Sequence, residues 1–166
     1  YSATNVTKIK KLLGVIAASA PFEPNISKIA QKLNLGRDTV NHYLRHLQDA
    51  YILFLANKPN RGISALQKPD KVFIENTAFV YALQSQPEIG TVRETFFINQ
   101  IKNAGYQINL GKKGDFLVDG TYTFEIGGRN KNAIQIKDVD NAYLALDDIE
   151  SGFGKQIPLW LFGFLY

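Results

Sequence analysis

The stretch NISKIAQKLNLGRDTVNHYLRHLQDA, residues 25–50, decides the fold of the first part of the chain. Asn25 can cap a helix, because its side-chain oxygen can accept an unpaired N–H of the first turn. Apolar side chains then recur at helical spacing, at Ile26, Ile29, Ala30 and Leu33 in one helix and at Val40, Tyr43, Leu44 and Leu47 in the next. Gly36 is expected to supply the positive φ that ends the first helix. Two short helices joined by such a turn predict a helix-turn-helix.

The flanking sequence extends this motif to a winged helix. Residues 5–20 carry apolar side chains on one helical face, and prolines stop that helix. Residues 51–55 and 71–74 are β-like runs, and turn-forming residues lie between them at 57–62. Three helices followed by a β-hairpin predict a winged-helix domain over residues 1–74.

The winged helix has a basic surface that could contact duplex DNA. In helix-turn-helix proteins the second helix of the motif enters the major groove, and basic side chains reach bases and phosphates. The candidate DNA-binding residues are Lys28, Lys32, Arg37, His42, Arg45, Lys58 and Arg61. Asp38 and Asp49 share the outward face of the second helix and would repel phosphate. That repulsion favours packing against a partner protein instead, and both interpretations stay open.

Composition divides the chain into two parts. Of 166 residues with a net charge of +4, residues 1–76 hold 11 basic and 5 acidic side chains, and residues 77–166 hold 8 and 10. This asymmetry indicates two units with different partners. No Cys is present, which excludes disulfides and thiolate zinc sites and agrees with a cytoplasmic location. His42 and His46 are spaced four residues apart, as metal ligands can be, but no third ligand is evident and no metal site is predicted.

The apolar runs of the chain are too short for a membrane span, so no membrane partner is expected. The longest of them covers residues 157–166 and is expected to be a buried core segment.

Residues 75–166 predict a second domain with a mixed sheet. The expected elements are a short helix around 78–83, a helix over 92–104 and strands over 106–110, 116–118, 122–126 and 142–146. One helix, three strands, a short connector and a further strand match the core of restriction-endonuclease-like folds. The fold class is therefore α+β or α/β, with an N-terminal winged helix-turn-helix before a restriction-endonuclease-like mixed-sheet domain.

Nucleases of that fold need a carboxylate on one strand and a Glu-x-Lys on the next, often with a further Glu from a helix. The candidate catalytic residues here are Glu94, Asp115 and Glu125. Carboxylates hold Mg²⁺ through their oxygens, and the lysine stabilises charge or orients the attacking water. Gly127 stands at the lysine position, so Arg129 or Lys131 would have to reach back across a Gly-Gly break.

The length of the loop between the second and third strands tests this constellation. A three-residue loop over residues 119–121 sets Asp115 opposite Glu125 on one face, whereas a two-residue turn sets the carboxylates on opposite faces. The three-residue loop also gathers the apolar side chains on one face, at Phe116, Val118, Tyr122 and Phe124. We therefore expect the three-residue loop.

Taken together, several stretches resemble the C-terminal half of a large family of bacterial and archaeal AAA-type ATPases. They are residues 25–30, 33–40, 43–44, 47–51, 71–76, 93–97, 114–116 and 124–128. In that family an ATPase domain precedes a winged helix and a restriction-endonuclease-like domain of unknown function. The resemblance implies a missing N-terminal ATPase domain, which agrees with a chain that has no Met and begins at Tyr1. It also implies that Glu94, Asp115 and Glu125 sit where nuclease acids sit.

The sequence thus favours a non-catalytic binding or regulatory region of an AAA-type ATPase, which contacts duplex DNA or a partner protein. A metal-dependent nuclease with a degenerate active site and a purely structural protein-interaction domain are the alternatives. No phosphate loop occurs, so no cofactor is expected for this part, and ATP and Mg²⁺ would belong to the full-length protein. The sequence does not predict the oligomeric state.

Overall fold

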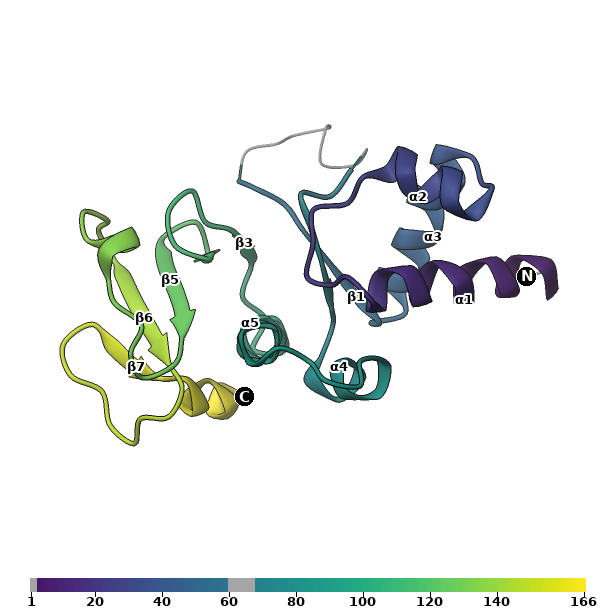
Figure 1. The fold of residues 1–166 in the computed structure, drawn as a ribbon. Helices are drawn as coiled ribbons and strands as arrows, with labels where there is room; N and C mark the ends of the chain where they lie inside the picture. Colours follow the sequence, from purple (N-terminus) through teal and green to yellow (C-terminus); the bar gives the residue numbers. More distant parts are fainter. Residues whose placement is uncertain (1–2, 60–67) are drawn as a thin grey trace. The chain divides into compact units, whose positions relative to one another are not determined.

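A computed structural model describes residues 3–59 and 68–166 of the chain, which form α-helices and two β-sheets (Figure 1). They divide into two compact units. Unit 1 contains the described residues up to Asn57 together with residues 68–87, and unit 2 contains Lys58, Pro59 and residues 88–166. The fold is therefore mixed α+β, as the sequence predicts at this coarser level.

Unit 1 consists of four helices and a two-stranded sheet. Its elements are α1 (Ala3–Ala17), α2 (Ile26–Leu33), α3 (Arg37–Asp49), β1 (Leu53–Ala56), β2 (Lys71–Ile74) and α4 (Thr77–Leu83). The two strands are antiparallel, with Leu53 opposite Ile74 and Ala56 opposite Lys71. Most of the apolar side chains predicted for the helix faces are buried with the strands, at Leu12, Ile16, Val40, Leu44, Leu53 and Phe73. Val6 of α1 is an exception at 40% exposed, and Leu33 of α2 is partly buried.

The turn between α2 and α3 differs from the prediction in one residue. Asn25 caps α2 as expected, with its Oδ1 accepting from the Lys28 N–H at 3.0 Å. The left-handed residue that ends α2 is Asn34, with φ 51°, because asparagine tolerates this conformation. Gly36 has φ −70° and instead begins α3, so the expected positive φ at Gly36 is wrong.

Helix α4 belongs to unit 1. Its Val80 is fully buried, and the Nε2 of Gln84, just after the helix, donates to the carbonyls of Ala17 and Ala20 at 2.9 and 3.1 Å. The units divide between Pro87 and Glu88, whereas the sequence predicts a boundary after Ile74. The polar segment after α4, and not the end of the hairpin, separates the units.

Unit 2 is built on a five-stranded mixed sheet with the order β3-β4-β5-β6-β7. Its elements are α5 (Ile89–Asn103), β3 (Ile108–Leu110), β4 (Phe116–Val118), β5 (Tyr122–Gly127), η2 (Ile134–Ile136), β6 (Ala142–Leu146), β7 (Gln156–Pro158) and η3 (Leu159–Phe164). Strands β3, β4 and β5 are antiparallel neighbours, whereas β5, β6 and β7 run parallel. Residues 128–141 form the crossover from β5 to β6.

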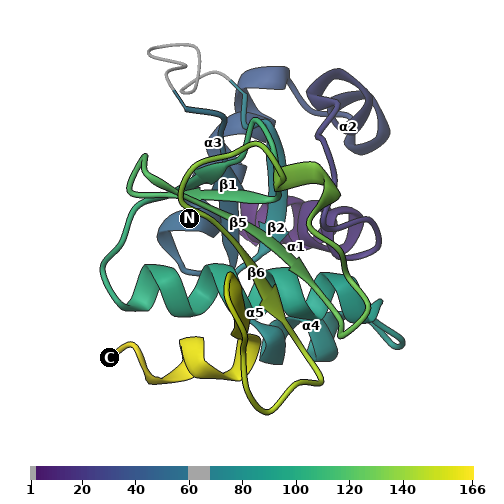
Figure 2. The ribbon, with the colours of Figure 1, turned by 90° about the vertical axis from the view of Figure 1, so that its left-hand side faces the viewer.

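One face of this sheet is covered by α5 and η3, which lie next to each other (Figures 1 and 2). Phe97 of α5 is fully buried, and its ring centroid lies 5.7 Å from Phe116, 5.0 Å from Phe124 and 4.8 Å from Phe162. The crossover covers the other face, where Ile136 packs on Ala142, Leu144 and Leu146. The carboxylates discussed below lie on this second face.

The C-terminal run is not the buried core segment that its composition predicts. Only Pro158, Leu159 and Phe162 are buried in residues 157–166, and Phe164 is 76% exposed. The run is divided between strand β7 and the short helix η3, so only one side of it can face α5. Strand β7 and the 3-10 helices η2 and η3 have no periodic signal that predicts them.

The helices are short for a lipid bilayer. Over residues 3–59 and 68–166, no helix is long and apolar enough to cross one, and the longest, α1 and α5, have 15 residues each.

Candidate functional site

The register of β4 and β5 brings two carboxylates together. Phe116 pairs with Phe124 and Val118 with Tyr122, so the loop has three residues, as expected. Asp119 and Gly120 make this loop possible with φ values of 48° and 66°. The same register sets Asp115 opposite Glu125, and the Asp115 N–H donates to the carbonyl of Phe124 at 2.9 Å.

Asp115 also touches the strand that carries Glu125. Its Oδ2 accepts from the backbone N–H of Ile126 at 2.7 Å. This bond fixes the side chain beside Glu125, and the charge of Asp115 is one cause of the raised pKa of Glu125. The two carboxylates therefore lie on neighbouring strands at opposed positions, close enough for the charge of Asp115 to raise the pKa of Glu125.

Glu125 is a fully buried carboxylate with one oxygen satisfied and one not. Its side chain is 0% exposed. Its Oε1 accepts from the Nε2 of Gln135 at 3.0 Å and from the Nζ of Lys131 at 2.5 Å. Its Oε2 has no hydrogen-bond partner within the described ranges. Burial raises the pKa of Glu125, the hydrogen bond from Lys131 opposes this, and the charge of Asp115 adds to it.

Lys131 occupies the space of the side chain that Gly127 lacks. A methyl group on the α-carbon of Gly127 would lie 2.6 Å from both Cβ and Cγ of Lys131 and 3.0 Å from its Cδ. The crossover turns back at once, since the Lys131 N–H donates to the carbonyl of Gly128 at 2.9 Å. The side chain of Lys131, four residues after Gly127, thus lies where a side chain at position 127 would lie and brings its ammonium group to the Glu125 carboxylate.

The second glycine of the Gly-Gly break makes room for an arginine. The guanidinium of Arg93 lies within 3.1–3.2 Å of where a methyl group on Gly128 would be. Arg93 donates through Nε to Asp147 at 2.9 Å and through Nη2 to Asp148 at 3.2 Å. These pairs tie α5 to the end of β6, next to the point where the crossover begins.

Lys131, and not Arg129, is the basic residue that pairs with Glu125. The sequence offered two basic residues, Arg129 and Lys131. Arg129 donates through Nε and Nη2 to the backbone carbonyl of Asp148, at 2.9 and 2.7 Å, so Lys131 is the one that reaches the Glu125 carboxylate. The hydrogen bond to Glu125 is the main cause that raises the pKa of Lys131, and the charge of Glu94, on α5, also raises it. Across the described ranges no group of three His, Asp or Glu side chains could hold a metal.

A pair of carboxylates nevertheless suits Mg²⁺. This ion keeps several waters and is commonly bound through one or two carboxylates together with substrate phosphates. The unpartnered, buried Oε2 of Glu125 is an anionic ligand without a hydrogen-bond donor in the described chain. A hard cation beside Asp115 would satisfy that atom while Lys131 stays on Oε1.

The predicted DNA-binding residues are all exposed where the structure describes them. They are Lys28, Lys32, Arg37, His42, Arg45 and Lys58, whereas Arg61 lies outside the described residues. The Nε2 atoms of His42 and His46 lie 2.7 Å apart on α3.

Sequence reasoning does not identify Gln135 or Arg93. Gln135 lies ten residues beyond Glu125, and Arg93 lies in a helix of weak amphipathic pattern. The detectable signal is the Gly127-Gly128 pair, because two adjacent glycines after a strand let other side chains approach the backbone closely.

Comparisons with known proteins add a family but no activity. The family model DUF8612, described as a domain of unknown function, matches residues 2–89. An uncharacterized protein of Methanocaldococcus jannaschii, MJ1544, is 25% identical over 145 residues, which cover 82% of this chain and 32% of that protein. The chain therefore spans about a third of the length of this relative. No solved structure matches.

Proposed function

This chain belongs to the DUF8612 family, and we propose that its unit 2 is the core of a divalent-metal-dependent phosphodiesterase of the nuclease type. Asp115, Glu125 and Lys131 are its working groups. The observation that carries the proposal is Lys131, which lies over Gly127 and pairs with Glu125 at 2.5 Å. The sequence argues against a nuclease mainly because position 127 lacks a lysine, and the position of Lys131 supports the proposal by supplying an ammonium group at Glu125.

The mixed sheet supports the same proposal. Its order of a helix, three antiparallel strands, a crossover and a parallel strand is the order expected from the sequence for a restriction-endonuclease-like core, which we propose for unit 2. In this proposal Asp115, directly before β4, and Glu125, on β5, are the two metal ligands. Bound Mg²⁺ or Mn²⁺ would supply an activated water and neutralise charge on the phosphate.

Lys131 is suited to hold positive charge and unsuited to act as a base. The hydrogen bond to Glu125 is the main cause that raises its pKa, so the ammonium stays protonated at neutral pH. Its side chain is 34% exposed, which lets a substrate phosphate approach it. Lys131 would therefore stabilise the negative charge that develops on the phosphate during attack.

Glu125 has the complementary role. Burial raises its pKa, and Lys131 and Gln135 hold its Oε1. Oε2 remains for a metal ligand bond. Because metal binding requires the ionised carboxylate, cleavage should increase as the pH rises through the elevated pKa of Glu125.

The test is cleavage of end-labelled single-stranded and duplex DNA and RNA, with Mg²⁺, Mn²⁺ or EDTA. We expect metal-dependent products from the wild-type chain and none from Asp115→Asn or Glu125→Gln. Lys137→Ala is the matched control for Lys131→Ala, since Lys137 is an exposed lysine of the same crossover. Cleavage that survives in Glu125→Gln, or that is equally lost in Lys137→Ala, contradicts the proposal.

We further propose that unit 1 is a winged helix that contacts duplex DNA through α3. Helices α1, α2 and α3 and the antiparallel pair of β1 and β2 follow the order expected of a winged helix, and Arg37 and Arg45 are exposed on α3. Binding that weakens steeply with added salt supports this role, whereas salt-insensitive or absent binding favours contact with a partner protein. In the full-length protein we propose an ATPase domain, with ATP and Mg²⁺, that this contact would regulate.

A further inference from the structure

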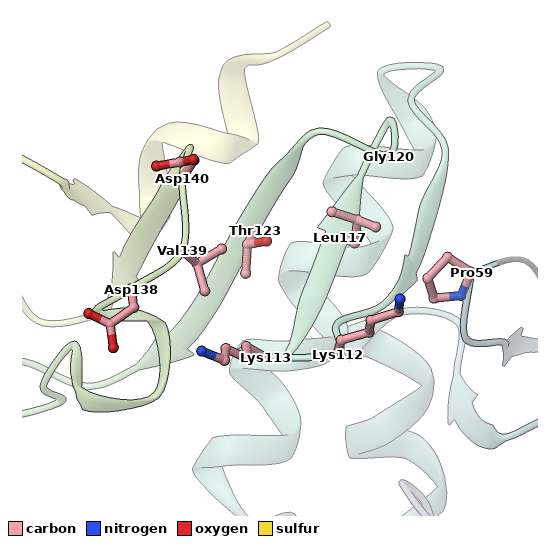
Figure 3. Close-up of a pocket in the computed structure, with 9 residues that line it drawn as sticks. All are labelled: Pro59, Lys112, Lys113, Leu117, Gly120, Thr123, Asp138, Val139 and Asp140. Atoms are coloured by element: carbon pink, nitrogen blue, oxygen red, sulfur yellow. The ribbon is translucent and has the colours of Figure 1, made fainter.

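We propose that a groove beside the carboxylates binds one unpaired nucleotide of the substrate strand. This inference rests on the proposed function, since it names the substrate class of the same site. The groove has a volume of about 590 Å³ and lies on the face of unit 2 that carries Glu125. Its lining, drawn in Figure 3, includes Lys112, Lys113, Leu117, Thr123 and Val139 with the aspartates on either side of it.

Two strands and two connections form the groove. Leu117 of β4 and Thr123 of β5 are register partners and make the floor, as Figure 3 shows. Lys112 and Lys113 come from the turn between β3 and β4, and the crossover supplies Val139 with an aspartate on either side. The groove therefore has a cationic end, an apolar floor and acidic side chains on the crossover.

This chemistry matches a nucleotide. Lysine ammonium groups bind phosphate as point charges, and neither Lys112 nor Lys113 is paired with an acid in the described chain. Leu117 and Val139 offer apolar contact to a base. Asp138 and Asp140 are exposed acceptors for the amino group of a base or for a sugar hydroxyl.

Two residues of the groove lie one strand position from the carboxylate pair, on the same face of the sheet. Thr123 and Glu125 point to the same face of β5, about 7 Å apart along the strand, a separation that one nucleotide of an extended strand can span. Lys113 and Asp115 are likewise separated by one residue, Gly114. A methyl group on Gly114 would lie 2.9 Å from Cγ2 of Thr123, so the lysine turn approaches β5 closely.

The size of the groove decides between an unpaired nucleotide and a base pair. A volume of about 590 Å³ suits one small ligand and is too small for a paired duplex segment. The proposed substrate is therefore a single strand, an overhang or a nucleotide turned out of a duplex. A phosphate in the Asp115–Glu125 site would then be followed by a nucleotide over Leu117 and Thr123.

The test uses the complete chain with the Glu125→Gln substitution, which prevents cleavage. Fluorescence anisotropy compares a labelled single-stranded deoxyoligonucleotide, the same strand with an unpaired overhang, and a blunt duplex. We expect tighter binding of the first two, and about tenfold weaker binding of both when Lys112→Ala and Lys113→Ala are combined. The matched control combines Lys137→Ala with Lys155→Ala, which removes the same charge from exposed lysines outside the groove.

Several outcomes would contradict the proposal that this groove binds an unpaired nucleotide. They are a blunt duplex that binds as well as the single strand, an equal loss in the control pair, wild-type affinity in the Lys112/Lys113 variant, or no binding at all. The proposed cleavage fails separately. If no metal supports cleavage by the wild-type chain but the binding pattern holds, the groove stands without the reaction. If cleavage occurs and the Lys112/Lys113 variant binds normally, the reaction stands without the groove.

Discussion

Replacing Gly127 with alanine should expel Lys131 from the site. The added methyl group would lie 2.6 Å from two carbons of Lys131, and these carbons belong to the first part of the side chain, which cannot yield without moving the ammonium. Glu125 would then lose the partner that lies 2.5 Å from its Oε1. Gly127→Ala should therefore have the same effect on Glu125 as Lys131→Ala, because both remove the Lys131 ammonium group from its carboxylate.

The magnitude follows from two opposing contributions. A hydrogen bond to a buried charged group contributes roughly 1.5–3 kcal/mol, and because Lys131 is 34% exposed, solvent screening reduces this to about 1–2 kcal/mol. Alanine in place of glycine stabilises by about 0.5 kcal/mol through the unfolded chain. This gain applies because Gly127 does not have a positive φ. We expect a net loss of about 1 kcal/mol in the free energy of unfolding.

Urea denaturation measures this loss, and carboxyl carbon NMR follows the pKa of Glu125. That pKa should rise further in Gly127→Ala, because the hydrogen bond from Lys131 lowers it. Gly90→Ala is the matched control, since a methyl group there meets nothing within 4 Å, and it should be slightly stabilising. The reasoning is refuted if Gly127→Ala is as stable as Gly90→Ala and the pKa of Glu125 does not change.

Three further predictions concern stability. The folded-state pKa of Glu125 lies above its unfolded value, so the free energy of unfolding should fall as the pH rises from about 4.5 through that raised pKa. Chemical denaturation across this pH range should show a free energy of unfolding that depends less on pH in Glu125→Gln than in the wild-type chain. Phe97→Ala should destabilise unit 2 by about 3–5 kcal/mol because its ring is fully buried, whereas Phe164→Ala, at an exposed ring, should change the thermal midpoint little. Asn25→Ala removes the cap on the Lys28 N–H and should cost about 1 kcal/mol in the urea unfolding of unit 1.

Much of the fold was predictable because its signals are local. The helix faces of α2 and α3 follow from apolar spacing, and the register of β4 and β5 follows from the alternation that Phe116 and Phe124 share across a three-residue loop. The relative position of Asp115 and Glu125 follows from that register alone. Local patterns therefore account for the two acids of the site.

The cations of the site could not be predicted in the same way. Lys131 and Arg93 reach the end of β5 through close approaches to Gly127 and Gly128, and a sequence shows only that glycines permit such approaches. Strand β7 was missed because its pairing partner β6, and not its own composition, makes it a strand. These features depend on tertiary contacts, which a one-dimensional pattern does not record.

The central claim is that Asp115 and Glu125 together bind a divalent metal beside Lys131. Electron paramagnetic resonance of free Mn²⁺, titrated with the chain at pH 7.5, measures this binding without any substrate. We expect one Mn²⁺ per chain, with affinity at least about tenfold weaker in Asp115→Asn and in Glu125→Gln, and a smaller change in Glu94→Gln. Wild-type affinity in both of the first two variants would contradict the account.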